Sequence, residues 1–267
     1  MANESILNST TRYSEMFSWG DGSRGQLGSS LSKEFTCFDV PQPVAFCSET
    51  ISDASCGQQH TLFLTVDGRV LSCGRNNEGQ LGKGKSKDSK GKLNGQTYDK
   101  AKTGMKPFGL KAVAAVACGQ EHCLALCESG DVYSWGRGDE GQLGRDYQMS
   151  QPGCVSIQAP WPVLITQVAC GNVHSLALSS GDVLSWGKNS HGQLGLGKAV
   201  DIQTVPLPVR ALLGVPVTQI SAGGAHTLAL TLHGLVYCCG ANNAGQLGLN
   251  RVDEKGTVHF YTLFCKV

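Results

Sequence analysis

The sequence predicts an all-β protein of the β-propeller class, and three observations support this. The tetrapeptide GQLG occurs five times at intervals of roughly 50 to 60 residues, a period typical of stacked repeat architectures. Short apolar, β-rich runs alternate with glycine turn signals in each interval. No segment shows the 3.6-residue apolar period of an amphipathic helix. The copies lie at Gly25–Gly28, Gly79–Gly82, Gly141–Gly144, Gly192–Gly195 and Gly245–Gly248.

The first element of each unit is a β-hairpin, which is clearest in the second copy. Thr61–Thr65 and Val70–Cys73 are short apolar runs. Asp67-Gly68 lies between them and supplies the positive φ that a tight hairpin turn requires. The later units carry equivalent turn signals at Ser129–Asp131, Ser180–Asp182 and His233–Gly234. We therefore expect the hairpin in four units.

Two further strands flank each hairpin. An upstream strand is predicted at Val113–Ala117, Ile165–Ala169 and Val217–Ala222, and proline-containing segments such as Val40–Val44 and Val205–Val209 suit an edge strand. Four short antiparallel strands in a unit of ~50 residues match one blade of a propeller better than a β-helix coil or a helical repeat.

The GQLG motif is predicted to fasten neighbouring sheets. Its two glycines allow sharp turns, and the leucine between them is expected to fill the gap between sheets. The glutamine amide should then bond to the backbone of the adjoining loop, because buried polar groups need partners. The third strand carries Trp19, Trp135 and Trp186, with Cys73 and Cys239 in equivalent places. We expect these residues in the core, with ligand stacking by the tryptophans as the alternative.

The paired motifs C-G-x-x-H-[TSC]-L and [WC]-G-x-[NGD]-x-x-G-Q-L-G resemble the repeat of the regulator-of-chromosome-condensation family. Examples are Cys118–Leu124 with Trp135–Gly144, and Cys170–Leu176 with Trp186–Gly195. The resemblance implies an RCC-type propeller of seven blades, whereas this chain has about five repeats and is incomplete relative to that ring. The segment ANNAGQLGLNRVDEKG resembles the amino-terminal propeller of HECT-and-RLD (HERC) ubiquitin ligases. Their catalytic HECT domain does not occur here.

The predicted domain boundaries follow from the first and last repeats. Residues 1–16 form a polar tail, residues 17–250 form the propeller repeats, and residues 251–267 form a C-terminal tail with a truncated blade. We expect a shortened isoform, a fragment or an incomplete gene model. A lysine-rich insertion loop at 83–106 lengthens one interval. A segment this rich in lysine can be a solvated loop without a binding role. The alternative is that it forms a surface that binds an acidic partner.

Charge and cysteine usage narrow the functional classes. The formal net charge is +1, which excludes global charge as a basis for nucleic-acid or membrane binding. No apolar run is long enough to span a membrane, and the polar start MANESILNST does not resemble a signal peptide. The 12 cysteines then indicate a reducing compartment. We expect a cytoplasmic protein, with the nucleus as the alternative.

Four histidines share one place in the unit: His60, His122, His174 and His226. A propeller spreads equivalent positions around a ring, so these imidazoles should diverge and bond to turn backbone instead of meeting at an ion. Cys118, Cys123 and Cys127 lack the C-x2-C spacing of zinc pairs. We predict no metal site.

Catalysis and cofactors are also not predicted. The Cys-x-x-x-His pairs, such as Cys56 with His60, could place a thiolate beside a base. The fourth unit has Ala222 in the cysteine position, so this position favours a small buried residue. No glycine-rich stretch has the pattern of a phosphate-binding loop.

The expected function is a non-catalytic protein-interaction platform. By resemblance it would recruit partners or substrates for a HERC-type ubiquitin ligase, and the alternative is guanine-nucleotide exchange on a Ran-like small GTPase. Chromatin and other nucleic acids are not expected as partners, because residues 1–16 are not basic. The candidate partner-binding residues are the insertion lysines Lys85, Lys87, Lys90 and Lys92.

Overall fold

The computed structural model of the chain describes residues 16–28, 37–44, 50–82, 90–93, 96–99, 104–105, 112–158, 164–197, 199–249 and 260–266. Nearly all regular structure in these residues is β-strand, and the one helix among them is a single 3-10 turn at Arg210–Leu212. The all-β prediction is confirmed. Within the same residues, no helix is both long and apolar enough to cross a membrane.

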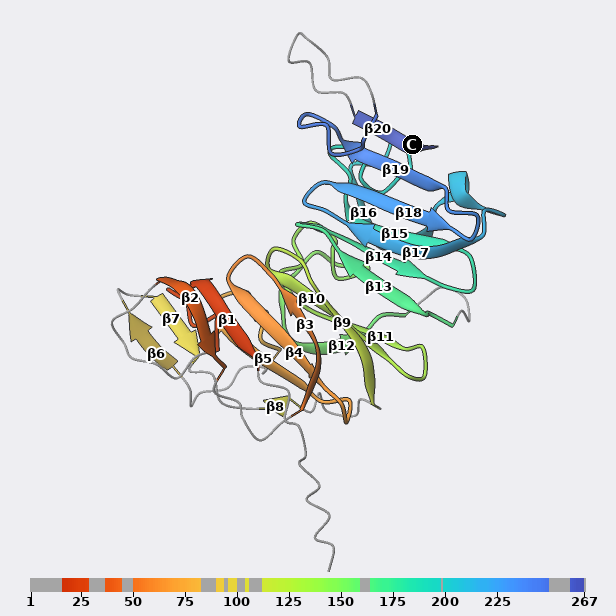
Figure 1. The fold of residues 1–267 in the computed structure, drawn as a ribbon. Coiled ribbons are helices and arrows are strands. Elements are labelled where there is room, and N and C mark those ends of the chain that lie inside the picture. The colour runs from red at the N-terminus through yellow and green to blue at the C-terminus, as the bar shows by residue number, and fades with distance from the viewer. Residues whose placement is uncertain are drawn as a thin grey trace, which may run out of the picture.

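The strands form five successive antiparallel sheets, which we call blades 1 to 5 (Figure 1). Blade 1 contains β1 (Phe17–Asp21) and β2 (Cys37–Pro43). Blade 2 contains β3 (Ile51–Cys56), β4 (His60–Thr65), β5 (Val70–Arg75), β6 (Lys90–Leu93), β7 (Gln96–Asp99) and β8 (Gly104–Met105). Blade 3 contains β9 (Val113–Cys118), β10 (His122–Cys127), β11 (Val132–Gly136) and β12 (Gln151–Ser156). Blade 4 contains β13 (Gln167–Cys170), β14 (His174–Leu178), β15 (Val183–Lys188) and β16 (Ile202–Pro208). Blade 5 contains β17 (Val217–Ala222), β18 (His226–Thr231), β19 (Val236–Ala241) and β20 (Phe260–Lys266).

The blades follow one another along an open arc, with blades 1 and 5 at its two ends (Figure 1). In blades 3 to 5 the four strands lie side by side in chain order. The first strands β3, β9, β13 and β17 contact one another in succession, so they line the inside of the arc. The predicted propeller blades, each built around a central hairpin, are therefore confirmed.

The connections of each blade alternate between two faces of the arc, because antiparallel strands reverse direction. In blade 3, residues 119–121 join β9 to β10, and residues 137–150, which include GQLG, join β11 to β12 at the same end. The hairpin turn at 128–131 lies at the opposite end. We call these the GQLG face and the hairpin face, and the other blades repeat the arrangement.

The hydrophobic core lies between successive blades. Leu62 and Leu64 of blade 2 pack with Val116 and Trp135 of blade 3 in one cluster of buried residues. Similar clusters join blade 3 to blade 4 and blade 4 to blade 5. Blades 3 and 4 therefore bury both of their surfaces against their neighbours, as expected for stacked sheets.

The predicted core tryptophans do not all lie in the core. Trp135 and Trp186 are buried, as expected, but Trp19 is 60% exposed. Its strand β1 belongs to blade 1, and the described residues include no sheet on the other side of that blade. A tryptophan at this position of the blade is therefore buried only where another blade packs on that side.

The lysine-rich insertion contains three short strands where the sequence predicts a loop. Strand β7 pairs with β5 at Gly74 and Asp99, and β8 pairs with β5 at Val70 and Met105. These two strands share the place of the fourth strand in blade 2. Strand β6 pairs with β7 and forms the outer edge of the sheet. Unpaired backbone groups along β5 explain why the insertion adds strands there.

The predicted C-terminal tail also differs from the structure. Residues 260–266 form β20, which pairs with β19 from Tyr237 and Lys266 to Ala241 and Phe260. This strand completes blade 5 in the way that β12 completes blade 3, so the blade is not truncated. Of the predicted polar tail at 1–16, only Met16 lies within the described residues.

The leucine of the GQLG turn is buried in blades 2 to 5, as predicted: Leu81, Leu143, Leu194 and Leu247 are each at most 2% exposed. The Leu143 carbonyl accepts a hydrogen bond from Ser134 Oγ at 2.7 Å, which ties the turn to the third strand of its own blade. A role for the leucine side chain in filling the gap between sheets stays a prediction.

Replacing Leu143 with Asp should lower the free energy of unfolding by more than about 3 kcal/mol, because the change removes buried apolar volume and buries a carboxylate. Urea unfolding measures this loss. Leu232 is 68% exposed on the hairpin face, so Leu232→Asp is the matched control and should change stability little. Equal effects of the two substitutions would contradict the role assigned to the turn.

Candidate functional site

The inner ends of blades 2 to 5 surround a cavity of about 430 Å³ on the GQLG face. Its walls are residues 56–58, 118–120, 170–172 and 222–224, from the turns between first and second strands. Backbone hydrogen bonds join these turns from blade to blade: Gln58 N to Gln120 O at 3.2 Å, Gln120 N to Asn172 O at 3.1 Å, and Asn172 N to Gly224 O at 3.0 Å. The cavity is therefore lined by backbone, amide and thiol groups without a carboxylate or basic side chain.

The histidines of these turns in blades 2, 3 and 4 reach into the next blade. His122 Nε2 lies 2.9 Å from Ser175 Oγ, and His174 Nε2 lies 3.0 Å from Thr227 Oγ1. Each ring also packs on the glycine three residues before it. A Cβ on Gly119 would collide with the ring of His122, which explains the C-G-x-x-H pattern by space alone. The prediction that these histidines are structural agrees with this geometry, although they bond to side chains of the next blade instead of turn backbone.

The glutamine carbonyl of the GQLG turn completes the link between blades. The Gln142 carbonyl accepts from Ser175 Oγ at 2.8 Å and from Trp186 Nε1 at 3.0 Å, both in blade 4. The same link joins the other blades: Thr61 Oγ1 to Gln26 O at 2.8 Å, Trp135 Nε1 to Gln80 O at 2.8 Å, and Thr227 Oγ1 to Gln193 O at 2.7 Å. We call each set of histidine, hydroxyl or thiol, and glutamine carbonyl a junction.

The glutamine side chain does not make this link, in contrast to the prediction. Gln142 Oε1 accepts from the backbone N–H of Glu140 at 2.9 Å, and Gln193 Oε1 accepts from that of His191 at 2.8 Å. Both bonds close the turn on itself. The fastening group is the main-chain carbonyl, which no sequence pattern of side chains could reveal.

The junction determines the protonation of its histidine. Ser175 Oγ has one hydrogen and donates it to the Gln142 carbonyl, so His122 Nε2 must be the donor to Ser175 Oγ. Burial, followed by the charges of the neighbouring histidines, lowers the pKa of His122 to about 3, and burial with the charge of His226 does the same for His174. Both rings are neutral near pH 7, and neither is suited to accept a proton in catalysis.

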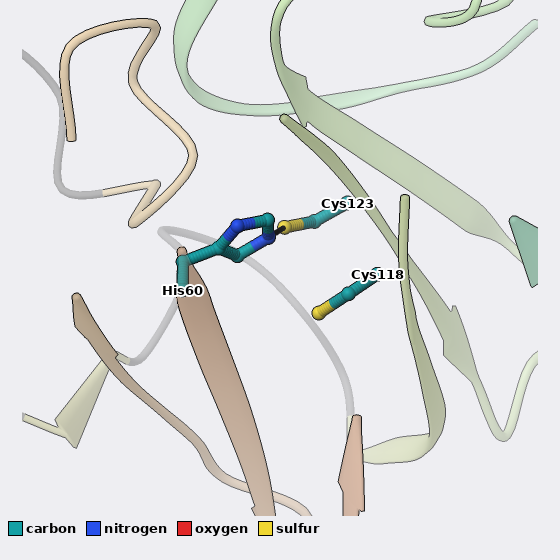
Figure 2. A group of neighbouring side chains, drawn as sticks. All are labelled: His60, Cys118 and Cys123. Atoms are coloured by element: carbon teal, nitrogen blue, oxygen red, sulfur yellow. Dashed lines mark hydrogen bonds between the residues drawn. The ribbon is translucent and has the colours of Figure 1, made fainter. Parts of the chain in front are cut away.

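The junction between blades 2 and 3 differs because sulfur replaces oxygen. His60 Nε2 lies 3.1 Å from Cys123 Sγ, and Cys123 Sγ lies 3.3 Å from the Gln80 carbonyl. Cys118 lies beside them (Figure 2). Burial raises the pKa of Cys123.

This convergence was not found from the sequence. The pairing of His60 with Cys118 and Cys123 was not predicted, because these cysteines lie more than 50 residues from it in the chain. The available signal was the residue after the histidine, which is Thr61, Ser175 or Thr227 in the other units and cysteine only at Cys123. The suggested pairing of Cys56 with His60 is not the one observed, because His60 Nε2 bonds to Cys123.

A row of ion pairs crosses the GQLG face. Glu121 bonds to Arg75 at 3.3 Å and to Arg137 at 3.1 Å, which links blades 2 and 3. Lys188 bonds to Glu140 at 2.7 Å, which links blades 3 and 4. Arg137 also pairs with Asp139 at 2.7 Å, so three basic groups meet three carboxylates. This row favours a partner with mixed polar groups instead of one of a single sign.

The candidate lysines fall in the insertion at the edge of blade 2. Lys90 and Lys92 lie in strand β6, and Lys85 and Lys87 lie outside the described residues. Their role in binding stays a prediction.

The family model named regulator of chromosome condensation (RCC1) repeat matches this sequence at residues 14–64, 67–126, 129–178 and 180–230. The chain belongs to the RCC1 repeat family. Each matched RCC1 repeat starts near the third strand of one blade and ends in the second strand of the next. Every match therefore contains the glutamine of a GQLG turn and the residue of the next blade that donates to its carbonyl.

Among curated relatives, the probable E3 ubiquitin-protein ligase HERC6 of Homo sapiens is 43% identical over 202 residues, covering 74% of this chain and 18% of HERC6. The probable E3 ubiquitin-protein ligase HERC4 of Rattus norvegicus is 40% identical over 245 residues, covering 90% of this chain and 22% of HERC4. The chain thus spans about a fifth of the length of these relatives.

Among solved structures, yeast RCC1 (Prp20) bound to Kap60 superposes with a TM-score of 0.74 at 24% identity, covering 95% of this chain and 57% of that one. This similarity shows the RCC1 propeller fold.

Stability should fall as the pH falls below neutral. The unfolded-state pKa of histidine is near 6.5, whereas those of His122 and His174 in the fold are about 3, so the unfolded state takes up the protons first. The stabilisation is complete above pH 6.5 and is lost progressively toward pH 3. Between pH 7 and pH 5 we expect a loss of about 2 kcal/mol for each histidine, measured by urea unfolding.

The control for this titration is His233→Gln, because His233 is exposed in a hairpin turn and makes no junction. Its pH dependence should match that of the unmodified chain. A free energy of unfolding that stays constant between pH 7 and pH 5 would show that folding does not lower the pKa values of His122 and His174, and would contradict the prediction.

Proposed function

We propose that this chain is a non-catalytic interaction platform, and that it is the partner-recruiting region of a HERC-type ubiquitin ligase or of a short form of one. The observation that carries the proposal is its 43% identity with a region covering 18% of HERC6. A region of this kind supplies binding, and its function lies in surface loops held by a rigid scaffold.

The GQLG face is the surface that we propose for the partner. It carries the long connections between third and fourth strands, whereas the hairpin face carries short turns. In blade 3 this connection exposes Tyr147 and Met149, at 47% and 66%. Tyrosine and methionine are enriched in protein interfaces, and polar groups around them supply a rim.

Hydrogen bonds hold both ends of this connection, one to the neighbouring blade and one to its own blade. Ser150 Oγ donates to Glu78 Oε2 at 2.9 Å, which ties the end of the connection to the GQLG turn of blade 2. At its start, Arg145 donates from Nη2 to the Ser134 carbonyl at 2.8 Å. Because both ends are fixed, the loop loses little freedom on binding, which favours affinity.

The insertion lysines belong to the same proposal. In the sequence the insertion directly follows the GQLG turn of blade 2, and that turn lies on the GQLG face. We propose that Lys85, Lys87, Lys90 and Lys92 add attraction for an acidic part of the partner, in a cytoplasmic setting.

The test is proximity labelling in cells with the unmodified chain and with the double variant Tyr147→Ala, Met149→Ala. Loss of an anchoring pair should lower the labelling of true partners roughly tenfold or more. We also expect partners lost in this way to be enriched in ubiquitin-modified proteins. Leu232→Ala, on the hairpin face, is the matched control and should keep them. Identical recoveries from all three chains would refute the assignment of this face.

Guanine-nucleotide exchange on a Ran-like small GTPase is the second candidate, and the RCC1 propeller fold is what favours it. The discriminating measurement is the release of labelled GDP from a panel of small GTPases by stopped flow. The leading proposal predicts the intrinsic release rate at micromolar concentrations of this chain. Acceleration that Tyr147→Ala does not affect would favour the exchange reaction over the recruiting role.

A further inference from the structure

The junction between blades 2 and 3 brings together three side chains that can bind a metal. His60 comes from the start of β4, Cys118 from the end of β9, and Cys123 from β10 (Figure 2). Their ligand atoms, His60 Nε2 and the two sulfurs, all lie within 4.8 Å of one another. Among the described residues, this is the one group of three or more such side chains with that proximity.

The fold holds these donors in place before any ion binds. Cys118 and Cys123 are direct partners across the β9–β10 pair. His60 is fixed by packing on Gly57 and by the blade 2–blade 3 junction. His60 and Cys123 are fully buried, and Cys118 is 9% exposed. Donors on strands with fixed side chains satisfy the requirement for a preorganised site.

The donor set selects the class of metal. Two thiolates and a neutral imidazole favour a soft or borderline divalent ion, and their charge of −2 cancels that of Zn²⁺ inside a buried site. Bonds of ~2.3 Å to sulfur and ~2.0 Å to nitrogen require donors roughly 3.6 Å apart in tetrahedral geometry. The 3.1 Å between His60 Nε2 and Cys123 Sγ must therefore open by about half an ångström.

We propose that His60, Cys118 and Cys123 bind one Zn²⁺ ion, with water from the inner cavity as the fourth ligand. Cys118 lines that cavity, so it marks the side from which water enters. The two thiols donate to the carbonyls of Ser55 and Gln80 at 3.2 and 3.3 Å when no ion is bound. Binding releases both thiol protons to solvent, moves the His60 proton from Nε2 to Nδ1, and replaces the N–H···S bond and two S–H···O bonds with one Zn–N and two Zn–S bonds.

The neighbouring junctions supply matched controls within the same chain. In the next junction, His122 and Cys170 occupy the places of His60 and Cys118, and Ser175 occupies that of Cys123. Cys123→Ser therefore copies a junction that already folds, and it removes one metal ligand. Ser175→Cys creates the same three donors one blade further along. Cys127→Ser alters a buried cysteine of β10 that is not in the group.

The experiment titrates the reduced full-length chain with Co²⁺, follows thiolate-to-cobalt charge-transfer absorption, and then displaces cobalt with Zn²⁺. Bound metal is counted by elemental analysis after gel filtration. We expect one ion per chain for the unmodified protein and for Cys127→Ser, none for Cys123→Ser, and two for Ser175→Cys. Circular dichroism verifies that each variant folds.

Three results would overturn the proposal. The first is that the unmodified chain retains no more metal than the Cys123→Ser variant. Cys123 would then only replace the serine hydroxyl that other junctions contain. The second is retention of Cu⁺ but not Zn²⁺. The third is a Cys118–Cys123 disulfide that persists in reductant, detected by intact mass.

Discussion

The hydrogen bonds at the junctions hold successive blades together, and the rest of the structure depends on them. Each junction joins a buried imidazole, a hydroxyl or thiol on the next blade, and the main-chain carbonyl of a GQLG turn. These polar groups are shielded from water, so each would cost free energy if it lost its partner. The blades can therefore stack in one register only, and apolar packing between sheets adds stability without having to specify that register.

This division of roles explains why the motif contains the residues that it does. Glycine before the histidine leaves room for the ring, as Gly119 does for His122. The glutamine side chain closes its own turn, and this aims its carbonyl at the next blade. The position directly after the histidine is Cys123, Ser175 or Thr227 in different blades, because any small side chain that can both donate and accept a hydrogen bond maintains the link.

The tolerance of that position also allows new chemistry without a change of fold. Where the group is sulfur, the junction acquires the donors of a metal site, while its neighbours with oxygen do not. The surface that we propose for a partner is another part of the molecule, the connections on the GQLG face, where Tyr147 and Met149 are exposed. Rigid links inside and variable loops outside are the arrangement expected of a binding scaffold.

The sequence by itself determined the all-β class, the hairpin in each unit and the burial of Leu143, because local turn chemistry and a repeated period are written in neighbouring residues. It also indicated that His122 and His174 are structural. Only the tertiary structure decided which groups meet across the blades: the glutamine carbonyl, the exposure of Trp19, the extra strands of the insertion, strand β20 and the approach of His60 to Cys118 and Cys123. These features depend on residues tens of positions apart, and spacing along the chain does not determine their distance in space.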